Sequence, residues 1–203
     1  MADYHPGLEG VIATESSISD INGEKGILSY RGYSIEELAE KSTFEETAFL
    51  LLTGELPTPD ELTKFTKQIN VRRDLPSGMI DLLKALPKES NPMDVIQLAV
   101  SSLGTFYPVT FDAEDLKAKK YTKDYYIEVS AGILGSIGSI VAAWNRIKNN
   151  KDYIKPDSNL SYADNFMHML DDSIEVTPLI SRIIDATLIL HAEHTINAST
   201  FTS

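Results

Sequence analysis

Apolar residues recur every three or four positions through most of the chain after Tyr33, which is the spacing of one face of an α-helix. Before Tyr33 the pattern differs, because short runs rich in β-forming residues flank Asn22-Gly23 and predict a β-hairpin. The sequence therefore predicts a mainly α fold, with a β-hairpin region at 1–33 and a helical domain at 34–203. The helices expected after residue 75 cover residues 79–86, 93–103, 124–148 and 162–170.

Capping residues locate several helix boundaries. A hydroxyl residue stands three positions before a glutamate at three places, and each is a capping box that starts a helix: Ser34 with Glu37, Thr43 with Glu46, and Thr58 with Glu61. Gly54 ends the second of these helices. Thr177 followed by Pro178 predicts the start of the last helix, because proline is well tolerated at the first helical position.

The long helix predicted at 124–148 carries Gly132, Gly135 and Gly138 on one flank. Small residues on a helix flank allow close approach of a neighbour to the helix backbone. We expect that neighbour to be another helix rather than a ligand. The most apolar part of this helix is shorter than a membrane span and is interrupted by glycines and serines, which favours a helix buried inside a globular domain.

Candidate chemistry gathers in the last part of the chain. If the last helix continues, His191, His194 and Asn197 follow each other at three-residue steps and neighbours share one face. From the residues alone, His191 on an apolar stripe is most simply a hydrogen-bonded core histidine. The order His-x-Glu-His differs from the His-Glu-x-x-His of zinc proteases, and the chain has no cysteine to complete a deaminase site, so we expect no metal.

The segment His191-Ala-Glu-His194-x-x-Asn197-Ala-Ser-Thr-Phe-Thr resembles a motif of the citrate synthase family. The resemblance implies that His194 contacts oxaloacetate and that Asn197 supports the same pocket. It assigns His191 a structural role or a role in supporting the substrate ligands. The family condenses acetyl-CoA with oxaloacetate to give citrate and CoA, so acetyl-CoA is a co-substrate and no bound cofactor is implied.

Other stretches carry the same resemblance along the whole chain. They are the opening from Gly7 to Tyr33, the run Leu51-Leu-Thr-Gly54-Glu-Leu-Pro57-Thr, and Pro92-Met-Asp-Val. One departure is Gln97, where the family usually has arginine. The resemblance implies a citrate-synthase-like multi-helical large domain and a homodimer formed through its helices.

The resemblance covers only about half of the family's length. The aspartate base, the histidine that stabilises the enol, the arginines that bind carboxylates and the small CoA-binding domain all lie beyond Ser203 in the family pattern. We therefore expect a truncated domain with no catalytic residue of its own, inactive in isolation. Two alternatives stay open: a fragment of 2-methylcitrate synthase, and a non-catalytic helical relic that only dimerises.

Composition narrows the partners. The 203 residues include 30 acids and 18 bases, and the formal net charge of −12 argues against nucleic acid and anionic membranes as partners. The absence of cysteine excludes disulfides and thiol catalysis, and the first residues lack the pattern of a secretory signal. We expect a cytoplasmic protein. Oxaloacetate and CoA are anionic, yet Arg182 is the nearest arginine before the histidine motif, so the basic pocket is expected elsewhere.

Overall fold

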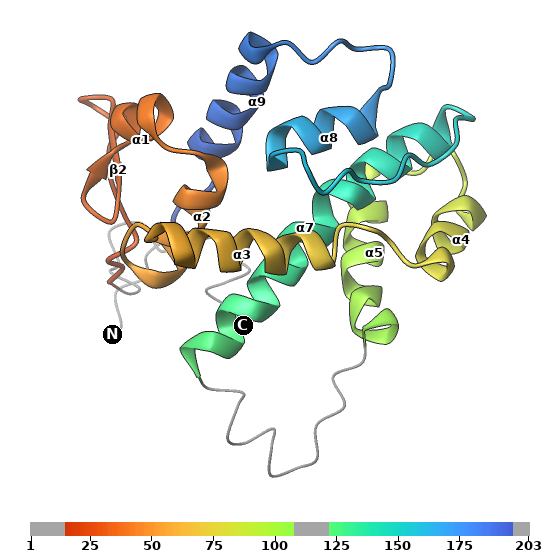
Figure 1. Cartoon of the computed structure of the whole chain (residues 1–203), viewed down its shortest axis with the longest axis horizontal. Coiled ribbons are helices and arrows are strands. Elements are labelled where there is room, and N and C mark those ends of the chain that lie inside the picture. Colours follow the sequence, from red (N-terminus) through yellow and green to blue (C-terminus); the bar gives the residue numbers. More distant parts are fainter. Residues whose placement is uncertain (1–14, 108–121, 197–203) are drawn as a thin grey trace, which may run out of the picture.

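The structure is a computed structural model that describes residues 15–107 and 122–196. Within these residues it forms eight helices and one small three-stranded sheet, which confirms the predicted mainly α fold with a β-hairpin (Figure 1). The strands are β1 (Ser19–Asn22), β2 (Ile27–Tyr30) and β3 (Tyr33–Ser34). The helices are α1 (Ile35–Lys41), α2 (Phe44–Thr53), α3 (Pro59–Val71), α4 (Ser77–Ala85), α5 (Pro92–Phe106), α7 (Lys123–Lys148), α8 (Tyr162–Leu170) and α9 (Pro178–Leu190).

Helix α7 is the central element, and α3, α5 and α8 pack against it (Figure 1). Gly135 is where α3 comes closest, because a Cβ placed there would lie 2.2 Å from the carbonyl oxygen of Ile69. The prediction that the glycine flank packs against another helix is therefore confirmed. Among the described helices, α7 alone is long and apolar enough to cross a membrane, a test that the core helix of a globular protein also passes.

The hairpin is closed by antiparallel pairing of β1 with β2, in which Ser19 lies opposite Tyr30. At the turn, the Asn22 side chain accepts a hydrogen bond from the Lys25 backbone N–H at 3.1 Å. Arg31 follows β2 with a left-handed φ of 50°, and its guanidinium donates to the carbonyl of Leu51 at 2.9 Å. The hairpin is thus fastened to the end of α2.

Most of the predicted helix boundaries are confirmed. Complete capping boxes begin α2 and α3, and Thr177 caps the start of α9. Gly54 ends α2 with a left-handed φ of 97°. Only one of the two hydrogen bonds of the capping box predicted for α1 is present. The Ser34 hydroxyl accepts from the Glu37 N–H, but the Glu37 carboxylate pairs with Lys41 at 3.2 Å instead of accepting from the Ser34 N–H.

Two clusters of buried apolar side chains form the core. One joins α4, α5 and the second half of α7. The other joins the hairpin to α1, α2, α3 and α9, and it includes Tyr30 and Ile189, both 0 % exposed. Burying such side chains contributes about 1.5–3 kcal/mol each, so the second cluster firmly connects the hairpin with α9. The proposed boundary between 1–33 and 34–203 stays a prediction.

Candidate functional site

The last described helix ends earlier than the sequence suggests. Helix α9 stops at Leu190, His191 is its C-cap, and Thr195 has a left-handed φ of 68°. The expectation that His191 and His194 continue the helix and share one of its faces is therefore wrong. Asn197 lies outside the described residues, so its predicted place beside them stays a prediction.

A tertiary contact accounts for the early end of α9. The Tyr30 hydroxyl lies 3.3 Å from the carbonyl oxygen of Leu190 and 3.2 Å from that of Glu193, and the Glu193 N–H donates back to it at 3.4 Å. In a continuing helix the Glu193 N–H would instead donate to the carbonyl of Ile189. That carbonyl accepts from the Ala192 N–H at 3.2 Å, so the last turn tightens and the chain leaves the helix.

His191 caps the helix it follows. Its Nδ1 lies 2.8 Å from the carbonyl oxygen of Thr187 in the last turn of α9, and that carbonyl also accepts from the His191 backbone N–H at 3.3 Å. In the tautomer with a proton on Nδ1, the ring donates this bond and keeps Nε2 available. The residue is exposed, so the interpretation of His191 as a core histidine is wrong.

His194 is exposed, and its ring makes no hydrogen bond to any residue in the described part of the chain. The residues beside it are held: Glu193 Oε1 accepts from the Thr195 N–H at 2.6 Å. Glu193 Oε2 is buried without a partner among the described residues. An imidazole presented in this way can donate a hydrogen bond to a carbonyl or carboxylate oxygen of a small anion.

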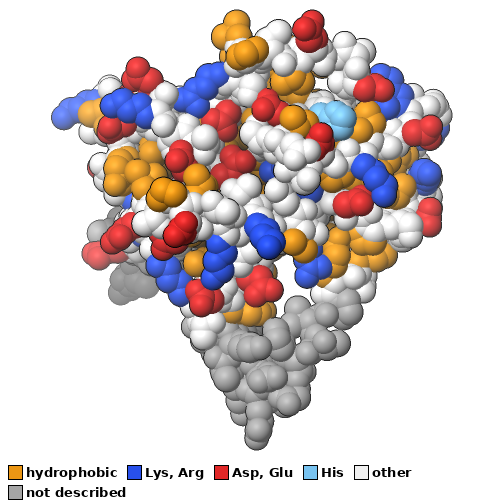
Figure 2. All heavy atoms as spheres, viewed as in Figure 1, with side chains coloured by type: hydrophobic (Ala, Val, Ile, Leu, Met, Phe, Trp, Pro, Cys, Tyr) orange, Lys and Arg blue, Asp and Glu red, His pale blue; other side chains and the backbone are white. Residues whose placement is uncertain are grey.

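The basic groups near α9 are already engaged. The Arg182 guanidinium pairs with Asp185 at 3.0 Å and donates to the carbonyls of Ser42 and Ala39. Asp185 also accepts from the Phe44 N–H at 2.9 Å, and its burial raises the pKa of its carboxyl. Arg182 therefore fastens α9 to α1 and α2. Acidic and basic side chains are interspersed on the face shown in Figure 2.

Two cavities among the described residues lie away from the histidine segment. One, of about 450 Å³, lies between α3, α5 and α7. The other, of about 890 Å³, lies between α8 and the start of α9 and is lined by His168 and several aspartates. In residues 15–107 and 122–196, no three histidine, aspartate or glutamate side chains come together in a group that could hold a metal ion.

Comparison with known proteins identifies the family. The family model described as "Citrate synthase, C-terminal domain" matches residues 7–203. Citrate synthase of Acidithiobacillus ferridurans is 42 % identical over 200 residues, which are 98 % of this chain and 50 % of that protein. The chain belongs to the citrate synthase family. It spans about half the length of the relatives it matches.

Solved structures agree with this citrate synthase membership. The crystal structure of citrate synthase from Pyrobaculum aerophilum matches with a TM-score of 0.84 and 37 % identity, over 97 % of this chain and 49 % of that one. A protein called 2-methylcitrate synthase 2, from Corynebacterium glutamicum, is 38 % identical over 99 % of this chain and 51 % of that protein. The predicted multi-helical citrate-synthase-like fold is confirmed.

Sequence reasoning missed two polar residues that connect distant parts of the chain: Tyr30, which bonds to the histidine segment, and Glu45, which bonds to the start of α8. Tyr30 and Tyr33 are the two aromatic residues of the hairpin strands, and nothing in the local pattern distinguishes Tyr30. Burial raises the pKa of the Tyr30 hydroxyl, and the nearby Glu193 carboxylate raises it further. Glu45 was also missed, although the sequence Glu45-Glu46 offered a signal. The capping box uses only Glu46, so Glu45 is free to bond to another part of the chain.

Proposed function

We propose that this chain is part of a citrate synthase, which condenses acetyl-CoA with oxaloacetate to give citrate and CoA, and that it supplies His194 as an oxaloacetate ligand. Membership of the family supports the reaction. The observation that carries the role of this chain is the exposed His194 ring, which has no partner among the described residues and follows a helix end held from two sides. Asn197 is proposed to support the same pocket, and His191 to support the segment.

The condensation needs more than this chain offers. A base must take a proton from the acetyl methyl group, a donor must stabilise the enol, and cationic groups must hold two carboxylates. Arg182 is used within the fold, and Glu45 and Asp185 are buried in structural contacts. We therefore propose that the catalytic residues belong to another part of the enzyme and that the 203-residue chain alone does not turn over.

We also propose that the enzyme is cytoplasmic and acts as a homodimer. Exposed apolar side chains on α5 and α7, among them Leu98, Val129 and Ile133, support a contact with a second copy.

A second candidate function is that of 2-methylcitrate synthase, in which propionyl-CoA replaces acetyl-CoA. The two Corynebacterium glutamicum relatives support it, at 38 % and 37 % identity.

An oxaloacetate titration followed by NMR of the imidazole protons tests the proposed ligand. Because the cationic groups that hold the carboxylates are proposed to lie elsewhere in the enzyme, we expect weak binding: the His194 signal moves and saturates at high oxaloacetate concentration, and the His168 signal, from a ring on α8, stays. His194→Ala should abolish the binding while His168→Ala preserves it. A His194 signal that ignores oxaloacetate contradicts the proposal.

A CoA-release assay with acetyl-CoA and oxaloacetate tests the second part of the proposal. The pure 203-residue chain should show no turnover above the uncatalysed rate. Measurable turnover that disappears with His194→Ala would show that the chain carries its own catalytic residues.

A further inference from the structure

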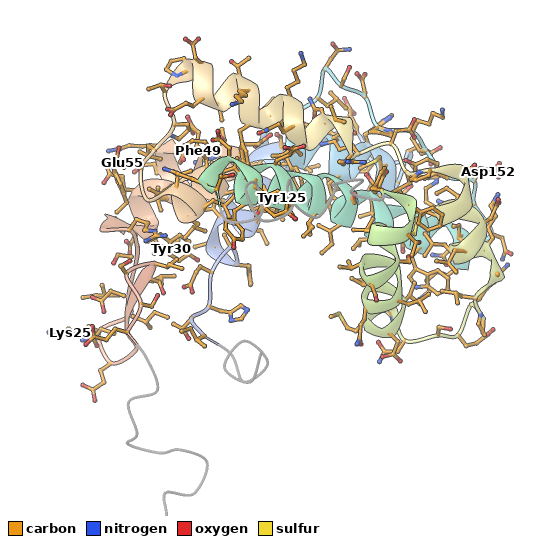
Figure 3. The ribbon with its side chains drawn as sticks, turned by 90° about the horizontal axis from the view of Figure 1, so that it is seen from below. Lys25, Tyr30, Phe49, Glu55, Tyr125 and Asp152 are labelled. Carbon is orange, nitrogen blue, oxygen red and sulfur yellow. The ribbon has the colours of Figure 1, made fainter. Side chains whose placement is uncertain are left out.

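Tyr30 connects the hairpin to a segment that lies far away in the sequence. It ends β2, and its side chain is 0 % exposed in the core cluster that also contains Ile189 of α9. Figure 3 shows Tyr30 on the side of the hairpin next to the end of α9, well away from Lys25 at the hairpin turn. The ring is thus fixed by packing, which determines where its hydroxyl lies.

Where the chain leaves α9, the Tyr30 hydroxyl bonds both to backbone carbonyls and to a backbone N–H. It has one proton to donate, shared between the carbonyls of Leu190 at 3.3 Å and Glu193 at 3.2 Å, and it accepts from the Glu193 N–H at 3.4 Å. Leu190 is the last residue of the helix, so its carbonyl has no partner inside the helix. One side chain therefore closes the helix and fixes the residue before His194.

A second constraint lies directly after His194. The Thr195 N–H donates to Glu193 Oε1 at 2.6 Å, and Thr195 has a left-handed φ of 68°, which is uncommon for a β-branched residue. Glu193 belongs to both constraints: its backbone bonds to Tyr30 and its carboxylate bonds to Thr195. The backbone of His194 is therefore held between them while its ring faces solvent.

We propose that Tyr30 is a positioning residue for the oxaloacetate ligand, and that its hydroxyl sets the orientation of the segment from Leu190 to Thr195 that presents His194. The identity of the ligand rests on the proposed function, whereas the positioning rests on the hydrogen bonds of Tyr30. Tyr30 does not itself contact substrate, because its ring is buried and its hydroxyl is occupied by backbone groups. Losing the hydroxyl spreads the imidazole over several orientations, which weakens a contact that depends on direction.

Tyr30→Phe tests this, because it removes the hydroxyl and keeps the ring in the core. Tyr33→Phe is the matched control, since Tyr33 belongs to the same hairpin but is 37 % exposed. In the full 203-residue chain, we expect amide hydrogen exchange at Glu193 and Thr195 to be about tenfold faster in Tyr30→Phe, with α7 amides unchanged and Tyr33→Phe like the wild type. Unchanged exchange at Glu193, or equal acceleration throughout the chain, overturns the proposal.

Oxaloacetate binding supplies the second measurement. Tyr30→Phe should weaken the shift of the His194 signal by several-fold at a given oxaloacetate concentration, while Tyr33→Phe leaves it unchanged. If Tyr30→Phe loosens the segment but binds oxaloacetate as well as the wild type does, Tyr30 is structural and the positioning role is refuted. If the wild type shows no binding at His194, the proposed function fails, and the exchange experiment still decides whether Tyr30 holds the segment.

Discussion

The Glu45 carboxylate accepts a hydrogen bond from the backbone N–H of Tyr162 at 2.8 Å, although 117 residues separate the two in the sequence. This N–H belongs to the first turn of α8, where no partner exists inside the helix. The Arg73 guanidinium lies 5.0 Å from the centre of the Tyr162 ring, and all three groups are buried. Burial raises the pKa of Glu45, raises that of Tyr162 to about 12, and lowers that of Arg73.

The raised pKa of Glu45 makes stability depend on pH. Folding favours the protonated carboxyl, so the stabilisation is fully present below the ordinary pKa of 4.5 and is lost as the pH rises through the higher folded-state value. Glu45→Gln keeps an acceptor for Tyr162 but cannot ionise. We expect the free energy of unfolding of the wild type, relative to Glu45→Gln, to fall as the pH rises above 4.5. Urea denaturation across this range measures it, and a pH-independent difference contradicts it.

Glu45→Ala isolates the hydrogen bond from the charge. It leaves the Tyr162 N–H buried without an acceptor, which costs about 1–3 kcal/mol of unfolding free energy. Glu45→Gln at the same pH is the control, because it retains the bond. Equal stability of the two variants would show that the contact between α2 and α8 does not depend on this acceptor.

Gly135 is required by the close approach of α3 to α7. A Cβ there would lie 2.2 Å from the Ile69 carbonyl oxygen and 3.2 Å from the Arg72 Cβ. The first atom is part of the α3 backbone and the second is bonded to it, so neither can move aside without shifting the helix. Gly135→Ala should therefore destabilise by about 1–3 kcal/mol. Gly104→Ala, in α5 with no atom within 4 Å, should stabilise by about 0.4–1 kcal/mol. Denaturation midpoints that move in the same direction for both variants contradict this account.

Much of the fold could be predicted from the sequence because its signals are local. Helix α8 was predicted at its observed boundaries, and the caps at Thr43 and Thr177 depend on residues within one turn. The end of α9 was not predicted, because its cause is Tyr30, whose hydroxyl reaches residues 160 and 163 positions away. The family motif singled out His194 as a candidate, which stays a prediction, and only the folded chain shows that His194 follows the helix instead of belonging to it.

The capping box of α3 should respond to acid. The Thr58 backbone N–H and hydroxyl both donate to the Glu61 carboxylate, at 2.9 and 2.7 Å, and these bonds lower its pKa. The stabilisation is present above the ordinary pKa of 4.5 and is lost as the pH falls through the lower folded-state value. The stability difference between wild type and Glu61→Gln should therefore shrink below pH 4.5. In a Thr58→Ala background that dependence should largely vanish, and its persistence would place the cause elsewhere.

The apolar surface of α5 and α7 predicts self-association. Val129 and Ile133 lie one turn apart on α7 and line the 450 Å³ cavity beside α5, and Ile133 is 42 % exposed. A charge placed in an apolar contact must be desolvated, so Ile133→Glu should shift sedimentation toward the monomer. Ile21→Glu is the control, because Ile21 is 50 % exposed on the hairpin, away from this surface. A wild type that sediments as a monomer at all concentrations, or two variants that behave alike, would exclude this surface as the contact between copies.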